Sequence, residues 1–337
     1  MNAYGAATHH GMPVRPGMTV PLPGHLHTQK DRLHELADLG YSDVWSAEAD
    51  GADAFTPLAL TAAWEPRLRL GTAIVPAYTR SPACFAQSVA SLADAAPGRF
   101  AIGIGSSSNV IVEKWNGLRF EEPYRKVRDI VRFLNDALSG EKVTKTYDTF
   151  DIQGFRLGIK PEVKPSILVA ALREGMLRLA AREADGAIIN WLSANDVRQV
   201  TKVVTDAAEG TPKEIVARIF VCPSTNTEQV RQAARFAIAA YLNVPVYADF
   251  HAWLGRGDDL RGMWDAWKAG DRKAALAAIP DHVVDDLVVH GSPEACRDRI
   301  KQYFDNGVTT SSLMILGLDP ALDFWQAVRD LSPSAHR

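Results

Sequence analysis

Two segments of the chain place polar side chains directly after an apolar segment, where they could bind a ligand or take part in a reaction. Glu48 follows the apolar segment Ser42–Ala47, and a carboxylate in that position can orient a ring or handle a proton. The alternative role for Glu48 is an ion pair at the rim. Three serines end the apolar segment that begins at Pro97: Ser106, Ser107 and Ser108. Three adjacent hydroxyls favour ligand contact over packing.

A third segment has the composition of a turn between a strand and a helix. Because the first amides of a helix have no partner within the helix, such a turn suits a phosphate. Arg173 could add a charge-assisted hydrogen bond, and an ordinary loop with a solvated arginine is the alternative. The residues of this loop are Ala170, Ala171, Leu172, Arg173, Glu174 and Gly175.

Aromatic and metal-binding residues give weaker signals. Trp45 and Trp191 stand near the ends of expected strands and could line an aromatic ligand, although packing is the commoner role of tryptophan. Gly103-Ile104-Gly105 lacks the third glycine of a dinucleotide fingerprint and could simply leave space inside the fold. Histidines cluster near the start of the chain without metal-ligand spacing, so we expect no metal site.

These residues need elements to position them, and the chain alternates short apolar segments with helical patterns. Eight interleaved strands that are apolar on both faces predict an α/β fold of the (β/α)8 TIM-barrel class with insertions; a doubly wound sheet is the alternative. In either fold the loops at the carboxyl ends of the strands bind ligands. The expected strands lie at 18–22, 42–47, 68–73, the segment from Pro97, 166–170, 186–190, 215–222 and 311–316.

Length and composition agree with one barrel. The 337 residues are 47% hydrophobic and 23% charged, and the formal net charge of −3 gives no electrostatic reason to expect nucleic acid or a membrane surface as a partner. We expect a flexible N-terminal arm over 1–15 and a single barrel domain over 16–337, with a hairpin excursion at Val143–Phe155 and a helical insertion near 245–280. The absence of a signal-peptide pattern favours the cytoplasm.

Several of these patterns, in this order, resemble the bacterial luciferase-like superfamily, and specifically its oxidoreductases that depend on the deazaflavin coenzyme F420. The resemblance covers residues 18–200 best. It rests on Asp43–Glu48, Arg69–Pro76 with Thr79–Pro82, Pro97–Phe100 with Gly103–Gly105, and Ala170-Ala171 followed by Ala184–Gly186.

The resemblance implies where a cofactor would bind. In these proteins the third strand often ends in a non-prolyl cis peptide that supports the back of the deazaflavin, which here would be Ala73–Ile74. The loop Ala170–Gly175 would bind the cofactor phosphate, and Glu48 and Asn190 would contact the ring or the ribityl chain. Pairing of such barrels through their helices leads us to expect a homodimer.

The chain also departs from the family pattern. The sugar-phosphate dehydrogenases of the family have a histidine where this chain has Ala49 and a glutamate where it has Ser108, so a glucose-6-phosphate activity is not expected. The remaining candidates for proton transfer are Glu48, Asp50 and Glu113. Trp115, near Glu113, joins Trp45 and Trp191 as a candidate for substrate contact.

The leading hypothesis is an F420-dependent oxidoreductase that transfers a hydride between the deazaflavin and an unidentified small organic substrate. The alternatives are an FMN-dependent luciferase-like monooxygenase and a non-catalytic barrel that binds F420.

Overall fold

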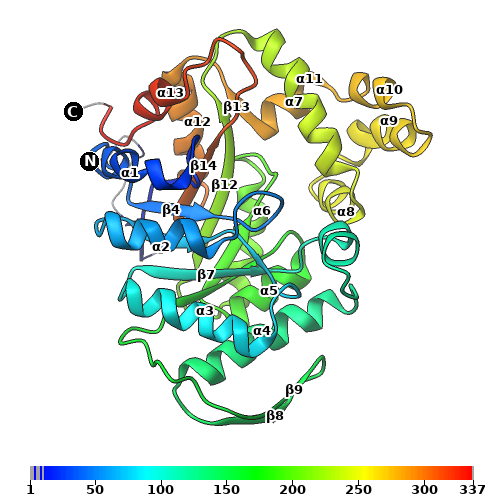
Figure 1. Ribbon diagram of the computed structural model, residues 1–337. Coiled ribbons are helices and arrows are strands. Elements are labelled where there is room, and N and C mark those ends of the chain that lie inside the picture. The colour runs from blue at the N-terminus through cyan, green and yellow to red at the C-terminus, as the bar shows by residue number, and fades with distance from the viewer. Residues whose placement is uncertain (1–3, 5–7, 10, 336–337) are drawn as a thin grey trace.

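The computed structural model describes residues 4, 8, 9 and 11–335, and within them the chain forms a closed barrel of eight parallel strands (Figure 1). Pairing of β10 with β7, with Ser166 opposite Ala101, closes the ring. The TIM-barrel prediction is therefore confirmed, and the open doubly wound sheet is wrong. In order around the barrel the strands are β3 (Gly17–Thr19), β4 (Asp43–Ser46), β5 (Arg69–Thr72), β7 (Phe100–Gly105), β10 (Ser166–Ala170), β11 (Gly186–Ile189), β12 (Glu214–Cys222) and β14 (Thr310–Ile315).

The first barrel strand is shorter than predicted. We expected it at 18–22, but β3 ends at Thr19. The amide of Val20 still donates to Trp45 O (2.9 Å), and Pro21 then ends the pairing because it has no amide proton.

Two short strands extend the barrel at its carboxyl end, and two others form a hairpin outside it. β6 (Val75–Pro76) pairs with β7, and β13 (Val288–His290) pairs with β12. β8 (Val143–Thr146) and β9 (Asp151–Phe155) are antiparallel, which confirms the predicted hairpin. In Figure 1 this hairpin lies beside α4, outside the barrel.

The predicted N-terminal arm falls partly outside the described residues. Within them, β1 (Thr8–His9) pairs with β2 (Met12–Pro13). The Tyr4 ring is buried, and its hydroxyl donates to Leu331 O. The other residues before Gly11 lie outside the described part of the chain, so the flexibility of this arm stays a prediction.

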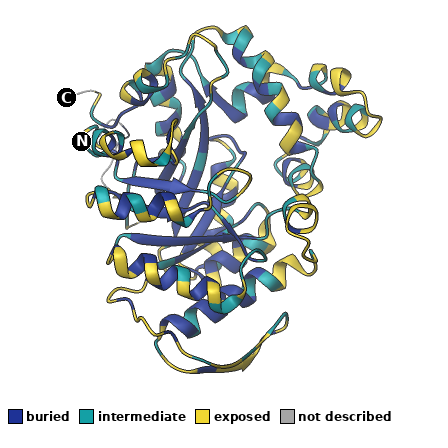
Figure 2. Ribbon diagram, viewed as in Figure 1, coloured by how far each residue is buried: buried dark blue, intermediate teal, exposed yellow. Residues whose placement is uncertain are grey.

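Helices surround the barrel and cover the outer faces of its strands, which are buried (Figure 2). Two of them begin at the Ser-Pro pairs Ser81-Pro82 and Ser292-Pro293, where a proline at the first position removes one amide that would have no partner within the helix. The helices around the barrel are α1 (Lys30–Asp38), α2 (Phe55–Trp64), α3 (Pro82–Ala95), α4 (Pro123–Leu138), α5 (Glu174–Glu183), α6 (Val197–Ala207), α7 (Thr227–Leu242), α12 (Pro293–Asp305) and α13 (Phe324–Asp330), with a 3-10 turn η1 (Leu26–Thr28) and a π-helical segment η2 (Val110–Trp115).

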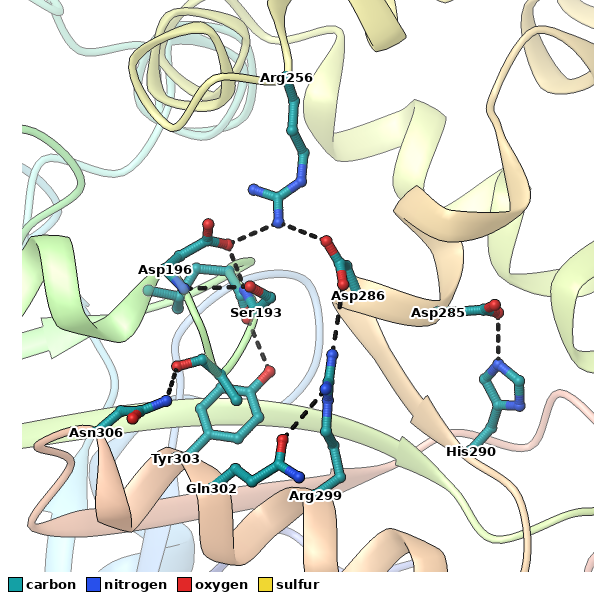
Figure 3. Close-up of polar contacts among 12 residues, drawn as sticks. Ser193, Asp196, Arg256, Asp285, Asp286, His290, Arg299, Gln302, Tyr303 and Asn306 are labelled. Atoms are coloured by element: carbon teal, nitrogen blue, oxygen red, sulfur yellow. Dashed lines mark hydrogen bonds and ion pairs between the residues drawn. The ribbon is translucent and has the colours of Figure 1, made fainter.

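Between α7 and β13 the chain forms the helices α8 (Pro245–Trp253), α9 (Gly257–Lys268), α10 (Arg272–Ala277) and α11 (Asp281–Leu287). Arg256, just before α9, joins this segment to the barrel (Figure 3). Its Nη2 lies 2.8 Å from Asp196 Oδ2, at the start of α6, and 2.9 Å from Asp286 Oδ2 on α11. Because Arg256 is only 7% exposed, this bridge fixes the insertion against the loop that follows β11.

The barrel interior is filled in layers. Trp45, Leu168, Ile188 and Val216 form an apolar layer. A Cβ added at Gly71 would lie 2.2 Å from the Trp45 ring, so that ring can lie in the barrel only because residue 71 is glycine. A Cβ at Gly103 would lie 2.0 Å from Thr72 O, which confirms that this glycine leaves needed space.

Below that layer, at the amino ends of the strands, lies a buried charged cluster. Arg69 Nη1 lies 2.7 Å from Glu214 Oε1 and 3.0 Å from Asp43 Oδ1, and Thr310 Oγ1 donates to Glu214 Oε1 (2.7 Å). Burial raises the pKa of Asp43. Burial alone would raise the pKa of Glu214 too, but Arg69 holds it below its usual value.

Among the described residues, no helix is both long and apolar enough to cross a membrane.

Candidate active site

Because all eight barrel strands are parallel, their carboxyl ends meet at one end of the barrel. Predicted site residues follow five of these ends, and Ala73 and Ile74 are those that follow β5. Glu48 follows β4, Ser106–Ser108 follow β7, Ala171–Gly175 follow β10, and Asn190 follows β11. The fold thus brings to one face segments that are more than 100 residues apart in the chain.

The peptide bond between Ala73 and Ile74 is cis, as the resemblance implies. Ile74 is partly exposed, and its carbonyl accepts a hydrogen bond from the amide of Glu48 (3.0 Å). A Cβ at Gly105 would lie 3.0 Å from Ile74 Cδ1, so a larger residue at 105 would displace Ile74. The support of a cofactor ring by this peptide stays a prediction.

The carboxylate of Glu48 is part of an ion pair. Arg80 Nη1 lies 2.6 Å from both Glu48 oxygens, Thr79 Oγ1 donates to Oε1 (3.0 Å), and the Ala54 amide donates to Oε2 (3.3 Å). These contacts correspond to the rim ion pair weighed as the alternative role. Through these contacts Glu48 can hold together the loops at the carboxyl end of the barrel. Contact between Glu48 and a cofactor stays a prediction.

The other two acids named for proton transfer, Asp50 and Glu113, are exposed. Glu113 belongs to η2, together with Trp115, which is 55% exposed. Both carboxylates are open to solvent, so the structure gives no reason to choose between them.

The three serines after β7 are partly exposed, and they differ in their contacts. Ser107 has a left-handed backbone (φ 62°). Ser108 Oγ accepts from the Ile111 amide (3.3 Å), and Ser106 Oγ donates to Ser107 O (3.4 Å). Ser108 thus helps to start η2, and contact of these serines with a ligand stays a prediction.

The loop after β10 ends at an open helix terminus. α5 begins at Glu174, and its first intrahelical hydrogen bond runs from the Leu177 amide to Arg173 O (3.0 Å). Glu174 and Gly175 are exposed, and a Cβ at Gly175 would meet nothing within 4 Å. Arg173 forms a half-exposed ion pair with Asp249 of α8 (3.1 Å). An anion can therefore approach the first amides of α5.

Asn190 and Trp191 follow β11, beneath the insertion. Asn190 Oδ1 accepts from the Trp191 amide (3.0 Å), and Asn190 Nδ2 donates to Tyr247 Oη of α8 (3.4 Å). The Trp191 ring is buried and stacks on Phe220, with 4.0 Å between ring centroids. Trp45 is also fully buried. Both tryptophans pack in the core, and their contact with a substrate stays a prediction.

Sequence reasoning missed Arg218, Tyr247 and His251. Arg218 projects into the barrel from β12, and its Nη2 donates to Ala73 O (3.2 Å). A signal was present, because Glu214, Val216 and Arg218 alternate along one face of β12. Nothing in the sequence tells that the insertion would bring Tyr247 to Asn190.

His251 is fully buried on α8, and neither of its ring nitrogens has a hydrogen-bond partner among the described residues. Burial, reinforced by the charge of Arg256, lowers the pKa of His251 to about 3. The imidazole is therefore neutral at physiological pH.

Comparison with known proteins agrees with this geometry. The pattern of the family described as luciferase-like monooxygenase matches residues 6–310. The chain belongs to this family. It is 26% identical over 278 residues to a 5,10-methylenetetrahydromethanopterin reductase of Methanolobus tindarius, covering 80% of this chain and 84% of that one. It is 25% identical over 321 residues to a putative coenzyme F420-dependent oxidoreductase of Mycobacterium tuberculosis, covering 88% and 90%.

Two solved structures share the fold. An F420-dependent secondary alcohol dehydrogenase, in complex with an F420-acetone adduct, superposes with a TM-score of 0.77 over 97% of this chain and 100% of that one, at 16% identity. The oxygenating constituent of 3,6-diketocamphane monooxygenase from Pseudomonas putida, in complex with FMN, superposes with a TM-score of 0.65 over 95% and 96%, at 16% identity. At such low identity these matches show the barrel and not its substrate.

Proposed function

We propose that the protein is an F420-dependent oxidoreductase that transfers a hydride between the deazaflavin and a small organic substrate at the carboxyl end of the barrel. The observation that carries this proposal is the similarity, along 88% of the chain, to a relative described as a putative F420-dependent oxidoreductase. The reductase of Methanolobus tindarius adds a second reductive enzyme to the relatives.

The residues at this end of the barrel fit such a cofactor. A phosphate would lie at the open start of α5, where free amides and the nearby Arg173 favour negative charge. The partly exposed Ile74 and Asn190 would border the ring. When bound, the deazaflavin supplies the hydride, and the protein supplies positioning and electrostatics.

The ion pair of Glu48 with Arg80 has a place in this proposal. It holds the loop after β4 against the turn before α3, so it keeps the wall of the cofactor site in position. Glu48, Asp50 and Glu113 remain candidates for proton transfer, and the contacts of Glu48 favour a positioning role for that residue.

A second candidate function is an FMN-dependent monooxygenase, favoured by the description of the family and by the FMN-bound neighbour. A third is a barrel that binds F420 without turnover. Cytoplasmic localisation and a homodimer belong to the proposal as well.

A cofactor panel tests the choice. Purified protein is titrated with F420, FMN and NADPH, and binding is measured by fluorescence quenching and calorimetry. We expect F420 to bind at micromolar concentration. Tight FMN binding with oxygen uptake would support the monooxygenase instead, and F420 binding without turnover of any substrate would support the non-catalytic barrel.

A further inference from the structure

Arg218 is a largely enclosed cation that forms no ion pair with an acid in the described part of the chain. Its Nη2 donates to a neutral carbonyl, Ala73 O, and its Nε has no hydrogen-bond partner among the described residues. Burial lowers the pKa of the guanidinium, and the polar groups that oppose this shift are the tyrosines Tyr241 and Tyr247 rather than a carboxylate. An arginine nevertheless stays charged in a protein.

The guanidinium of Arg218 lies at the carboxyl end of the barrel, the end that carries the candidate site. Protein atoms enclose the side chain, yet part of its surface is accessible to solvent. It reaches from β12 to the carboxyl end of β5, next to Ile74. A cation there, shielded from bulk water, stabilises negative charge that appears on a ligand far more than an exposed cation would.

Tyr247 and Arg218 are close enough for their charges to interact, and the Tyr247 hydroxyl can donate a proton. Because the Trp191 amide donates to Asn190 Oδ1, the amide group of Asn190 turns its Nδ2 toward Tyr247 Oη. The phenol oxygen therefore accepts a hydrogen bond, and no acceptor for its own proton is recorded in the described part of the chain. Burial raises the pKa of Tyr247 to about 12, so the proton is present at neutral pH.

We propose that Tyr247 and Arg218 together receive the oxygen of a carbonyl substrate, a small ketone or aldehyde. Tyr247 acts as the general acid, and Arg218 stabilises the negative charge on oxygen. This proposal rests on the proposed function, which supplies reduced deazaflavin as the two-electron donor.

The step balances. A C–H bond forms as a hydride from the reduced deazaflavin reaches the carbonyl carbon, and the π electrons of the C=O bond move to oxygen. That oxygen takes the proton of Tyr247, which breaks the phenolic O–H bond. The phenolate regains a proton from solvent, and this proton is balanced by the ring N–H proton that the deazaflavin would release to solvent once it has lost its hydride. In reverse, the same residues oxidise a secondary alcohol to a ketone.

The oxyanion site can be tested without cofactor. Benzoate, a stable carboxylate probe, is titrated into cofactor-free protein by calorimetry. We expect the wild type to bind it, Arg218→Met to bind it at least about tenfold more weakly, and Tyr247→Phe to bind it roughly threefold to tenfold more weakly. Tyr124→Phe, which changes an exposed tyrosine on α4, should bind like the wild type. Equal binding by wild type and Arg218→Met, or no binding by the wild type, would overturn the proposal.

Measurements of turnover test whether Tyr247 donates the proton to the substrate oxygen. With F420 loaded and acetone, 2-butanone and benzaldehyde as probes, Tyr247→Phe should lower kcat by about 10²- to 10⁴-fold while the Kd for F420 stays unchanged. Arg218→Lys should restore part of the activity lost in Arg218→Met, and the thermal unfolding of each variant shows that it is folded. Wild-type kcat in Tyr247→Phe, or no turnover of any probe by the wild type, would overturn the assignment. If the wild type fails to bind F420, the proposed function fails, whereas the benzoate titration still tests the oxyanion site.

Discussion

Arg80 Nη1 lies 2.6 Å from both carboxylate oxygens of Glu48. This contact links the loop after β4 with the turn that precedes α3, and the Arg80 guanidinium also lies 4.8 Å from the centre of the Phe55 ring. One side chain therefore joins three segments at the wall of the candidate site.

Arg80→Ala should destabilise the protein by about 1–2 kcal/mol, because it leaves the partly buried Glu48 without a counter-charge. Urea unfolding measures the change. Arg119→Ala removes an arginine whose ion-pair contact with Glu121 is long (3.9 Å) and exposed, and it should cost less than about 0.5 kcal/mol. Equal losses of unfolding free energy in the two variants would show that the ion pair with Glu48 stabilises the protein no more than an exposed surface contact does.

Arg69→Met should destabilise the protein more strongly, by about 3–5 kcal/mol, because the buried Asp43 and Glu214 would lose the cation that contacts both, with Arg15 remaining 3.9 Å from Asp43. Arg156→Met, which removes an arginine whose ion pair with Glu141 is long (3.7 Å) and exposed, serves as the matched control and should cost below about 1 kcal/mol. Chemical denaturation of both variants gives the comparison. If Arg69→Met lowered the unfolding free energy only slightly, the carboxylates of Asp43 and Glu214 would take up protons at little cost in stability, which contradicts this prediction.

His251 predicts a dependence of stability on pH. Its pKa is lowered from 6.5 to about 3 in the folded protein, so the unfolded chain binds more protons between these values. The stability contributed by neutral His251 is complete above pH 6.5 and is lost as the pH falls toward 3. At pH 5 this loss is roughly 2 kcal/mol.

The variant His251→Phe has no group to titrate at this position. The difference in unfolding free energy between wild type and variant should therefore change between pH 7 and pH 5, in the direction that favours the variant at the lower pH. Denaturant unfolding at both values measures it. A difference that stays constant with pH would contradict the buried neutral imidazole.

Arg173 should contribute to cofactor affinity. Arg173→Ala should raise the Kd for F420 roughly threefold to tenfold, because a charge near the phosphate at the start of α5 is lost. Asp249→Asn frees Arg173 from its ion pair and should leave the affinity unchanged or increase it. Fluorescence titration at low and high salt measures both, and the two variants should converge at high salt. An unchanged Kd in Arg173→Ala would place the phosphate elsewhere.

The parts of the fold that depend on local pattern could be predicted from the sequence. Short segments apolar on both faces gave eight strands, and Ser81-Pro82 marked the start of α3. The residues at which strands end were harder to predict, because hydrogen bonding to the neighbouring strand decides them, as where Pro21 ends the pairing of the first barrel strand. The loops of the candidate site followed from the strands, since parallel strands bring their carboxyl ends together.

The contacts inside the site could not be predicted, because they join distant residues. Arg218 and Ala73 are 145 positions apart, and Asn190 and Tyr247 are 57 apart. No local sequence pattern predicts that Arg80 contacts Glu48, or that Arg256 holds the insertion over the loop after β11. The cis peptide at Ala73–Ile74 was expected only from the family resemblance.

Crystals of the protein soaked with oxidised F420 provide the most direct measurement. We predict electron density for the deazaflavin at the carboxyl end of the barrel, with its ring beside Ile74 and its phosphate at the first amides of α5. Density for the cofactor at any other place, or none at saturating F420, would contradict the account.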